Sequence, residues 1–224
     1  MARTIAQRRI GGRALASRKI ATTQPAGFDP YVTTFPPGSW TFNAPASGLY
    51  KFVAWGCGAV NSNSSGHSGS YLEKKKYLGM GQSVSMVVAR ASSGGAGVVD
   101  TTLTFPDGTG ATAGSAVVNG SPGTATGGDV NLNGSSGGDT SGTAGSDGLG
   151  TGGGLGGIGN NVSVGGGAGA PAILPFRGGS GGRGDLSLNA QNESGGSPGG
   201  GAASYSGGSG NGAGSGMVVV VRLA

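Results

Sequence analysis

The chain has 224 residues, of which 10% are charged and 35% are hydrophobic, while 54 are glycine. Charge this low argues against the common, highly charged kind of unstructured chain. A single cysteine and a single histidine exclude an internal disulfide framework and, within one chain, a nitrogen and sulfur metal site. The length suits one domain or one and a half, and we expect no membrane insertion because no segment is long enough to span a bilayer.

Residues 1–27 are predicted to form a basic N-terminal arm. Residues 1–20 hold six basic side chains and no acid, whereas the other 204 residues hold eight basic and nine acidic ones. The six are Arg3, Arg8, Arg9, Arg13, Arg18 and Lys19. Such an arm can bind nucleic acid or an acidic protein surface, and its composition also fits a transit peptide or a merely solvated terminus. We predict that it docks to a partner protein and do not expect nucleic acid.

A strand-rich section follows at 28–118 and is predicted to build the base of the fold together with 217–224. Strands are expected at 38–43, at 49–55, at 83–89 after the turn signal Gly79-Met80-Gly81-Gln82, and at 98–105 before Pro106-Asp107-Gly108. Within 70–78, the run Lys74-Lys75-Lys76 is typical of a solvated strand face or a protected sheet edge. Cys57 is expected to be a small buried residue. No helix of convincing length is predicted after residue 20.

Residues 119–216 are predicted to be a glycine-rich insertion, because 37 of these 98 positions are glycine and the chain then closes on Met-Val-Val-Val-Val-Arg-Leu. Such a β-branched run belongs in the interior of a sheet. Short alternating strands are expected at 128–133, 161–164 and 184–189. Glycine recurs at every third position from 142 to 148, again from 150 to 159, and from 178 to 184. Three residues is the period of polyproline II, and glycine on one side would let such helices share backbone hydrogen bonds.

The fold prediction is therefore mostly β, with little or no α-helix. It is a jelly-roll-like β-sandwich base with a glycine-rich insertion that forms polyproline or polyglycine II helices and short strands. No catalytic, metal or cofactor site is predicted: the carboxylates are scattered, no nucleotide loop leads into a helix, and His67 is the only histidine. Symmetric copies of His67 around a trimer axis are the one metal arrangement that the sequence leaves open.

Several runs along the chain resemble glycine-rich domains of bacteriophage tail fibres and adhesins. They are Phe35-Pro-Pro-Gly-Ser-Trp-Thr-Phe, Pro45-Ala-Ser-Gly-Leu-Tyr-Lys-Phe-Val-Ala-Trp-Gly-Cys-Gly-Ala, Gly69-Ser-Tyr-Leu-Glu-Lys, Leu78-Gly-Met-Gly-Gln-Ser-Val, Thr102-Leu-Thr-Phe and Gly128-Asp-Val-Asn-Leu-Asn. The similarity covers residues 35–224. It implies a β-sandwich that carries glycine-rich helices and a role in attachment of the virion to bacteria.

The expected function is that of a non-enzymatic virion protein, a short tail fibre or spike subunit that forms a homotrimer. Its arm would dock on other tail or capsid proteins, and its body would bind a host cell-surface glycan or protein. The predicted receptor-binding residues are Phe176, Arg177, Gln191, Asn192 and Tyr205. The two aromatic residues would serve equally well as plugs of the helix bundle. Alternatives are a capsid decoration or head-fibre protein without a receptor, an extracellular matrix or ice-binding protein, and a depolymerase.

Overall fold

The computed structural model describes residues 32–59, 67–90, 99–117, 120–136, 199 and 213–223, and within them it contains ten strands and no helix. The strands are β1 Val32–Phe35, β2 Gly38–Asn43, β3 Gly48–Trp55, β4 Tyr71–Leu78, β5 Ser83–Val88, β6 Thr101–Thr104, β7 Gly110–Ala113, β8 Ala125–Thr126, β9 Val130–Leu132 and β10 Met217–Arg222. The prediction of a mostly β fold is confirmed. The jelly-roll-like connectivity and the glycine-rich helices stay predictions.

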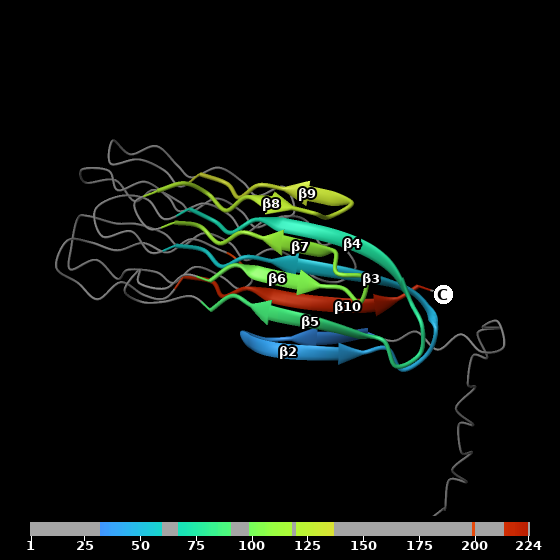
Figure 1. Ribbon diagram of the computed structural model, residues 1–224. Helices are drawn as coiled ribbons and strands as arrows, with labels where there is room; N and C mark the ends of the chain where they lie inside the picture. The colour runs from blue at the N-terminus through green and yellow to red at the C-terminus, as the bar shows by residue number, and fades with distance from the viewer. Residues whose placement is uncertain are drawn as a thin grey trace, which may run out of the picture.

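The strands form two five-stranded antiparallel sheets (Figure 1). Sheet A has the order β1-β10-β3-β4-β9, and sheet B has the order β2-β5-β6-β7-β8. The valine-rich β10 lies between β1 and β3, with Val219 opposite Thr34 on one side and Val53 on the other. The predicted interior position of the closing strand is therefore confirmed. Strands β8 and β9, from the start of the expected insertion, are edge strands of the two sheets.

One hydrophobic core lies between the sheets. Alternate residues of sheet A, such as Phe52 on β3 and Leu72 on β4, meet alternate residues of sheet B, such as Phe42, Met86 and Leu103. Edge-on aromatic contacts cross this core, with ring centroids 5.8 Å apart for Phe42 and Phe52 and 5.3 Å apart for Phe52 and Phe105. The period-2 alternation of the strands thus supplies a conventional core from a chain with few large apolar residues.

The outer face of sheet A carries a second buried cluster. It consists of Val53, Trp55, Tyr71 and Val219, and the rings of Trp55 and Tyr71 meet edge-on at 5.3 Å. Beside it, Lys51 pairs with Glu73 at 3.4 Å, and the Tyr71 hydroxyl donates to the same carboxylate. Burial, and then the Glu73 hydrogen bond, raise the pKa of Tyr71 well above its ordinary value. The two buried charged groups of this face, Lys51 and Glu73, therefore neutralise each other.

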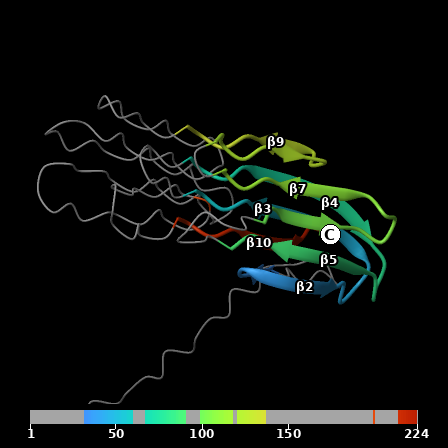
Figure 2. The same ribbon diagram turned by 60° about the vertical axis from the view of Figure 1, so that its left-hand side comes forward.

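The two ends of the two-sheet body differ, and both views show the difference (Figures 1 and 2). At one end, called the turn end, short connections at 44–47, 79–82 and 105–109 join β2 to β3, β4 to β5 and β6 to β7. Gly81 and Gly108 adopt positive φ angles of 79° in two of these turns. The long connections, at 56–70, 89–100, 114–124 and 133–216, all leave from the opposite end, called the glycine end.

Candidate functional site

Where the strands leave the sheets at the glycine end, their extensions pack into a layer that we call the glycine junction. It comprises residues 56–59, 67–70, 114–117, 120–124, 133–136, 199 and 213–216. Consecutive residues here bond to different segments. The Gly56 N–H donates to the Ser70 carbonyl, the Cys57 carbonyl accepts from the Ala116 N–H, and the Gly58 N–H donates to the Gly214 carbonyl, each at 2.9 Å.

Residues 68–70 repeat this pattern. Their N–H groups donate to three other segments, at Ser135 (3.1 Å), Gly199 (3.0 Å) and Gly114 (2.9 Å). A strand in a sheet bonds to neighbours on two sides of one plane. Three consecutive N–H groups that donate to three different segments instead fit a bundle of extended chains such as polyproline II helices, which have three residues per turn. The junction thus pairs its segments through the backbone in several directions, whereas the glycines of the three-residue spacing, at 142–159 and 178–184, lie outside the described residues.

The junction admits only glycine at its closest contacts. A Cβ atom would lie 2.0 Å from the Gly114 carbonyl oxygen if placed on Gly123, 2.1 Å from that same oxygen if placed on Gly56, and 2.0 Å from the Ser68 carbonyl oxygen if placed on Gly134. All of these neighbours are backbone atoms held by hydrogen bonds, so they cannot rotate away. Glycine is therefore required here by close approach rather than by an unusual φ angle.

Small polar side chains complete the hydrogen bonding at the base of the junction. Ser115 accepts from the Cys57 N–H at 3.0 Å and donates to the Val99 carbonyl at 2.9 Å. Thr101, which is fully buried, donates to the Trp55 carbonyl at 2.7 Å and accepts from the Ala89 N–H at 2.9 Å. These hydroxyls satisfy buried backbone groups without pushing the segments apart.

Cys57 lies inside this layer and is fully buried, as predicted. Burial raises the pKa of its thiol. We therefore expect the native chain to react with a colorimetric disulfide reagent far more slowly than the chain unfolded in urea, because the thiolate is the reactive form. A time course of thiol release with and without urea measures this, and equal rates in the two conditions would contradict the burial of Cys57.

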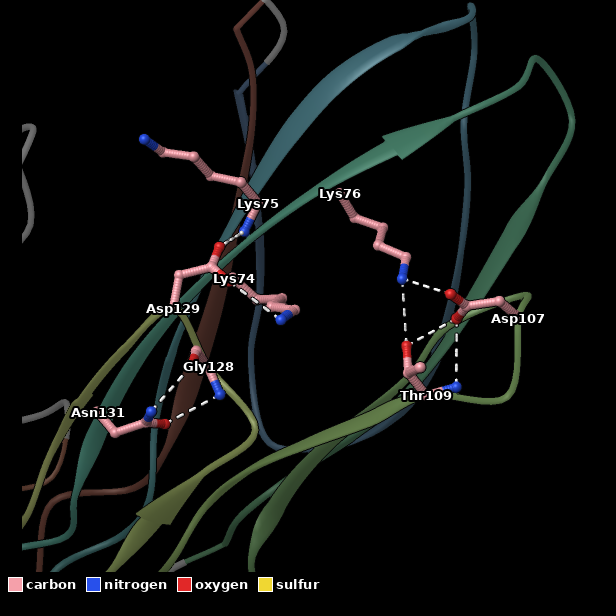
Figure 3. Close-up of polar contacts among 8 residues, drawn as sticks. All are labelled: Lys74, Lys75, Lys76, Asp107, Thr109, Gly128, Asp129 and Asn131. Carbon is pink, nitrogen blue, oxygen red and sulfur yellow. Dashed lines mark hydrogen bonds and ion pairs between the residues drawn. The ribbon is translucent and has the colours of Figure 1, made fainter.

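The lysine run of β4 joins the two sheets at their rim (Figure 3). Lys74 and Lys76 alternate with the core residues Leu72 and Leu78, so they start on the core-facing side of sheet A. Lys76 reaches Asp107 and, at 3.3 Å, Thr109 in the β6–β7 turn of sheet B. The expected solvated face fits Lys75 only, because alternation directs Lys74 and Lys76 inward and carboxylates meet them at the edge of the core. The alternative, a protected sheet edge, fits this stretch, since among the described strands β9 pairs with β4 only as far as Glu73.

Asp129 binds the same run from the turn between β8 and β9. Its carboxylate accepts from Lys74 Nζ at 3.0 Å and from the Lys75 N–H at 2.7 Å, while its own N–H donates to the Glu73 carbonyl at 2.7 Å. Lys75 itself is exposed, and its side chain points away from both carboxylates. Lys74, Lys76 and the Lys75 N–H therefore bond two turns to β4, while the Lys75 side chain is exposed.

Acid is expected to weaken this rim. Hydrogen bonds from Lys76 and then Thr109 hold the pKa of Asp107 well below its usual range, and the Lys75 N–H followed by Lys74 lower the pKa of Asp129. A carboxyl group with a depressed folded pKa stabilises the fold above its unfolded value of about 4, and this contribution is lost as the pH falls further. Thermal unfolding from neutral pH to about pH 2 should show a smaller acid-induced loss for Asp107→Asn/Asp129→Asn than for the wild type. Equal losses would contradict this assignment.

The predicted docking residues Arg3, Arg8, Arg9, Arg13, Arg18 and Lys19 lie outside the described residues. So do the predicted receptor-binding residues Phe176, Arg177, Gln191, Asn192 and Tyr205.

His67 lies in the junction, where its carbonyl accepts from the Ala59 N–H at 3.0 Å, and burial lowers the pKa of its ring. Among the described residues, no three metal-ligating side chains gather, and no helix could cross a membrane. Comparisons with protein-family models and with curated proteins find no match to this chain.

Proposed function

We propose that the chain is a structural subunit of a bacteriophage virion, a short tail fibre or spike without catalytic activity. Its basic arm docks on other virion proteins, and its glycine-rich body projects outward and binds a glycan or protein of the host surface. The observation that carries this proposal is the separation of the two ends of the two-sheet body. Val32, the first described residue after the arm, pairs with Val221 at the turn end, opposite the glycine junction.

This arrangement suits a part that docks at one end and displays at the other. An eight-residue strand such as β3 spans about 26 Å, so the sheets hold the described start of the glycine-rich segment well away from Val32. The junction then ties extensions of both sheets together through backbone bonds. A rigid base with its long connections gathered at one end is how folds commonly present binding loops.

The resemblance of residues 35–224 to glycine-rich domains of tail fibres and adhesins supplies the virion context. We propose a homotrimer, because virion fibres are symmetric assemblies. The proposed receptor-binding residues remain those predicted from the sequence, Phe176, Arg177, Gln191, Asn192 and Tyr205. The proposed virion-docking residues remain the six basic residues of the arm.

The test uses the full-length chain and a variant in which all six basic residues of the arm are replaced by glutamine. Mass spectrometry of purified virions is expected to find the wild-type chain. Purified wild-type chain should bind host cells and slow phage adsorption, while the arm variant should still bind cells but fail to join virions. Absence from virions would overturn the proposal. Presence in virions without cell binding would identify a decoration or head-fibre protein, and loss of host polysaccharide on incubation would identify a depolymerase.

A further inference from the structure

The outer face of sheet B is chemically uniform. Its outward side chains are hydroxyls, with an amide at Asn43, an apolar group at Val87 and no side chain at Gly110. None of the outward positions within its five strands carries a charge. In strand order they are Ser39, Thr41 and Asn43 on β2, Ser83, Ser85 and Val87 on β5, Thr102 and Thr104 on β6, Gly110 and Thr112 on β7, and Thr126 on β8. The outer face of sheet A, by contrast, carries Lys51, Glu73 and Lys75.

The strand register aligns these groups in rows. Thr41, Ser85 and Thr104 lie opposite one another across three strands, and Ser39, Val87 and Thr102 form the adjacent row. Neighbouring strands lie about 4.8 Å apart, and alternate residues along a strand about 6.7 Å apart. The face is therefore a regular grid of short polar groups.

A groove of about 320 Å³ lies over β2, β5 and β6 within this face. Its lining combines those two rows with Trp40 and Met86. Met86 belongs to the core. Trp40 alternates with the outward residues of β2, and its ring packs against Phe35 with centroids 5.9 Å apart, while its indole N–H donates to the Pro36 carbonyl at 2.7 Å. The volume is at the lower end of the range for small-molecule sites, about 300–1,000 Å³.

The hydroxyls of the groove are available for a ligand. Among the described residues, none forms a side-chain hydrogen bond with the hydroxyls of Ser39, Thr41, Ser85, Thr102 or Thr104. Outside the groove, Ser83 on the same face donates to Asn43 at 2.7 Å. Each free hydroxyl offers one donor and two acceptor positions, and Val87 and the threonine methyl groups add apolar contact between them.

This chemistry selects one class of ligand. A face without charge has no counter-ion for a phosphate, a sulfated sugar or a basic peptide. Interfaces between proteins are enriched in aromatic residues, methionine and arginine and are depleted in serine, and the six outward groups of the groove show the opposite composition. A neutral sugar matches it, because a pyranose presents several hydroxyls beside apolar C–H groups.

We infer that the groove on the outer face of sheet B binds a neutral glycan through Thr41, Ser85, Thr102 and Thr104, with Val87 under the ring. The inference deepens the proposed host-binding function, on which its biological meaning rests. It adds a receptor site on the two-sheet body, apart from the glycine-rich segment. Binding of the isolated sugar can be measured without virions or cells.

The test titrates the full-length chain with neutral hexose and N-acetylhexosamine oligosaccharides of two to six units, beside sialylated and sulfated counterparts, by calorimetry. At least one neutral series is expected to bind, with little dependence on ionic strength. Each of Thr41→Val, Thr102→Val and Thr104→Val keeps the side-chain shape and removes one hydroxyl, so each should weaken binding about fivefold, and the triple variant about a hundredfold. Thr112→Val, on the same face outside the groove, should leave the affinity unchanged.

Ser85→Tyr provides a second readout, because it fills the groove and should abolish sugar binding while circular dichroism and unfolding remain those of a folded chain. Binding of no neutral sugar, or equal losses in the Thr112→Val and groove variants, would overturn the inference. A change of oligomeric state in Ser85→Tyr by sedimentation would overturn it in favour of contact with a second copy of this chain. If sugar binding fails but the wild-type chain still binds host cells, the proposed function stands and its receptor site lies elsewhere.

Discussion

Gly123→Ala is expected to lower the free energy of unfolding by about 3 kcal/mol or more, far more than the same substitution at Gly110. The added Cβ would lie 2.0 Å from the Gly114 carbonyl oxygen and 2.7 Å from the Ser70 nitrogen. Those two atoms belong to the extensions of different sheets and bond to each other at 2.9 Å. The methyl group would therefore separate the segments and break the bond that joins them.

Urea unfolding followed by tryptophan fluorescence measures this effect, since Trp55 lies in the buried cluster next to the junction. Gly110→Ala is the matched control. Gly110 is an exposed residue of β7, and its Cβ would meet only the Leu103 carbonyl oxygen, at 3.5 Å, an ordinary contact. The control should be neutral or slightly stabilising, because alanine restricts the unfolded chain. A similar loss in both variants would show that the close contacts do not determine stability.

Glu73→Ala is expected to cost about 3 kcal/mol, because it leaves a buried ammonium group without its partner. Lys51 is only 7% exposed, and the Glu73 carboxylate accepts from both Lys51, at 3.4 Å, and the Tyr71 hydroxyl. After the substitution, two buried donors would have lost their acceptor. The free energy of unfolding in urea measures the loss.

Two companion variants separate the charge from the side chain's volume. Lys51→Met/Glu73→Leu removes both charges and keeps apolar bulk, so it should recover most of the stability lost in Glu73→Ala. Lys75→Ala removes the exposed lysine opposite Lys51 in the register and should change stability by no more than about 0.5 kcal/mol. If the double variant were as unstable as Glu73→Ala, the loss would reflect packing rather than an unpaired charge.

The strands with a strong local pattern could be predicted from the sequence. The predicted 38–43 coincides with β2, and 49–55 and 83–89 each differ from β3 and β5 by one residue at one end. Of the predicted 98–105, the described residues form β6 over Thr101–Thr104, and Asp100 just before it accepts from the Ser115 N–H at 2.7 Å, while residue 98 lies outside the described residues. Turn signals at Gly79–Gln82 and Pro106–Gly108 fixed the neighbouring boundaries.

The strands made of small residues could not be predicted locally. Strand β7 is Gly-Ala-Thr-Ala, which has little β preference, and it exists because it pairs with β6. Strand β9 carries a visible alternation, but its place at the edge of sheet A depends on pairing with β4 across about sixty residues. Local propensity contains no information about such partners.

The polar contacts show the same limit. The lysine run is visible in the sequence, but the alternation that turns two of its members inward takes effect only because Leu72 and Leu78 face the core. Their partners, Asp107 and Asp129, lie 31 and 55 residues further along the chain. Similarly, the hydroxyls of sheet B were visible as alternate polar positions, and only the strand register gathers them into one face.

The place of β10 has a consequence for the order in which the chain folds during synthesis. Among the ten described strands, β1 pairs only with β10, and β10 is the last of the ten to leave the ribosome. Until then β1 has no partner and β3 keeps an open edge, however long the glycine-rich segment takes to emerge. Closing a loop this long adds only a modest entropy cost, which grows with the logarithm of its length, but such distant pairing slows folding. Chains interrupted before β10 would thus lack the strand that joins β1 to β3, so a nascent chain cannot complete sheet A before β10 is in place.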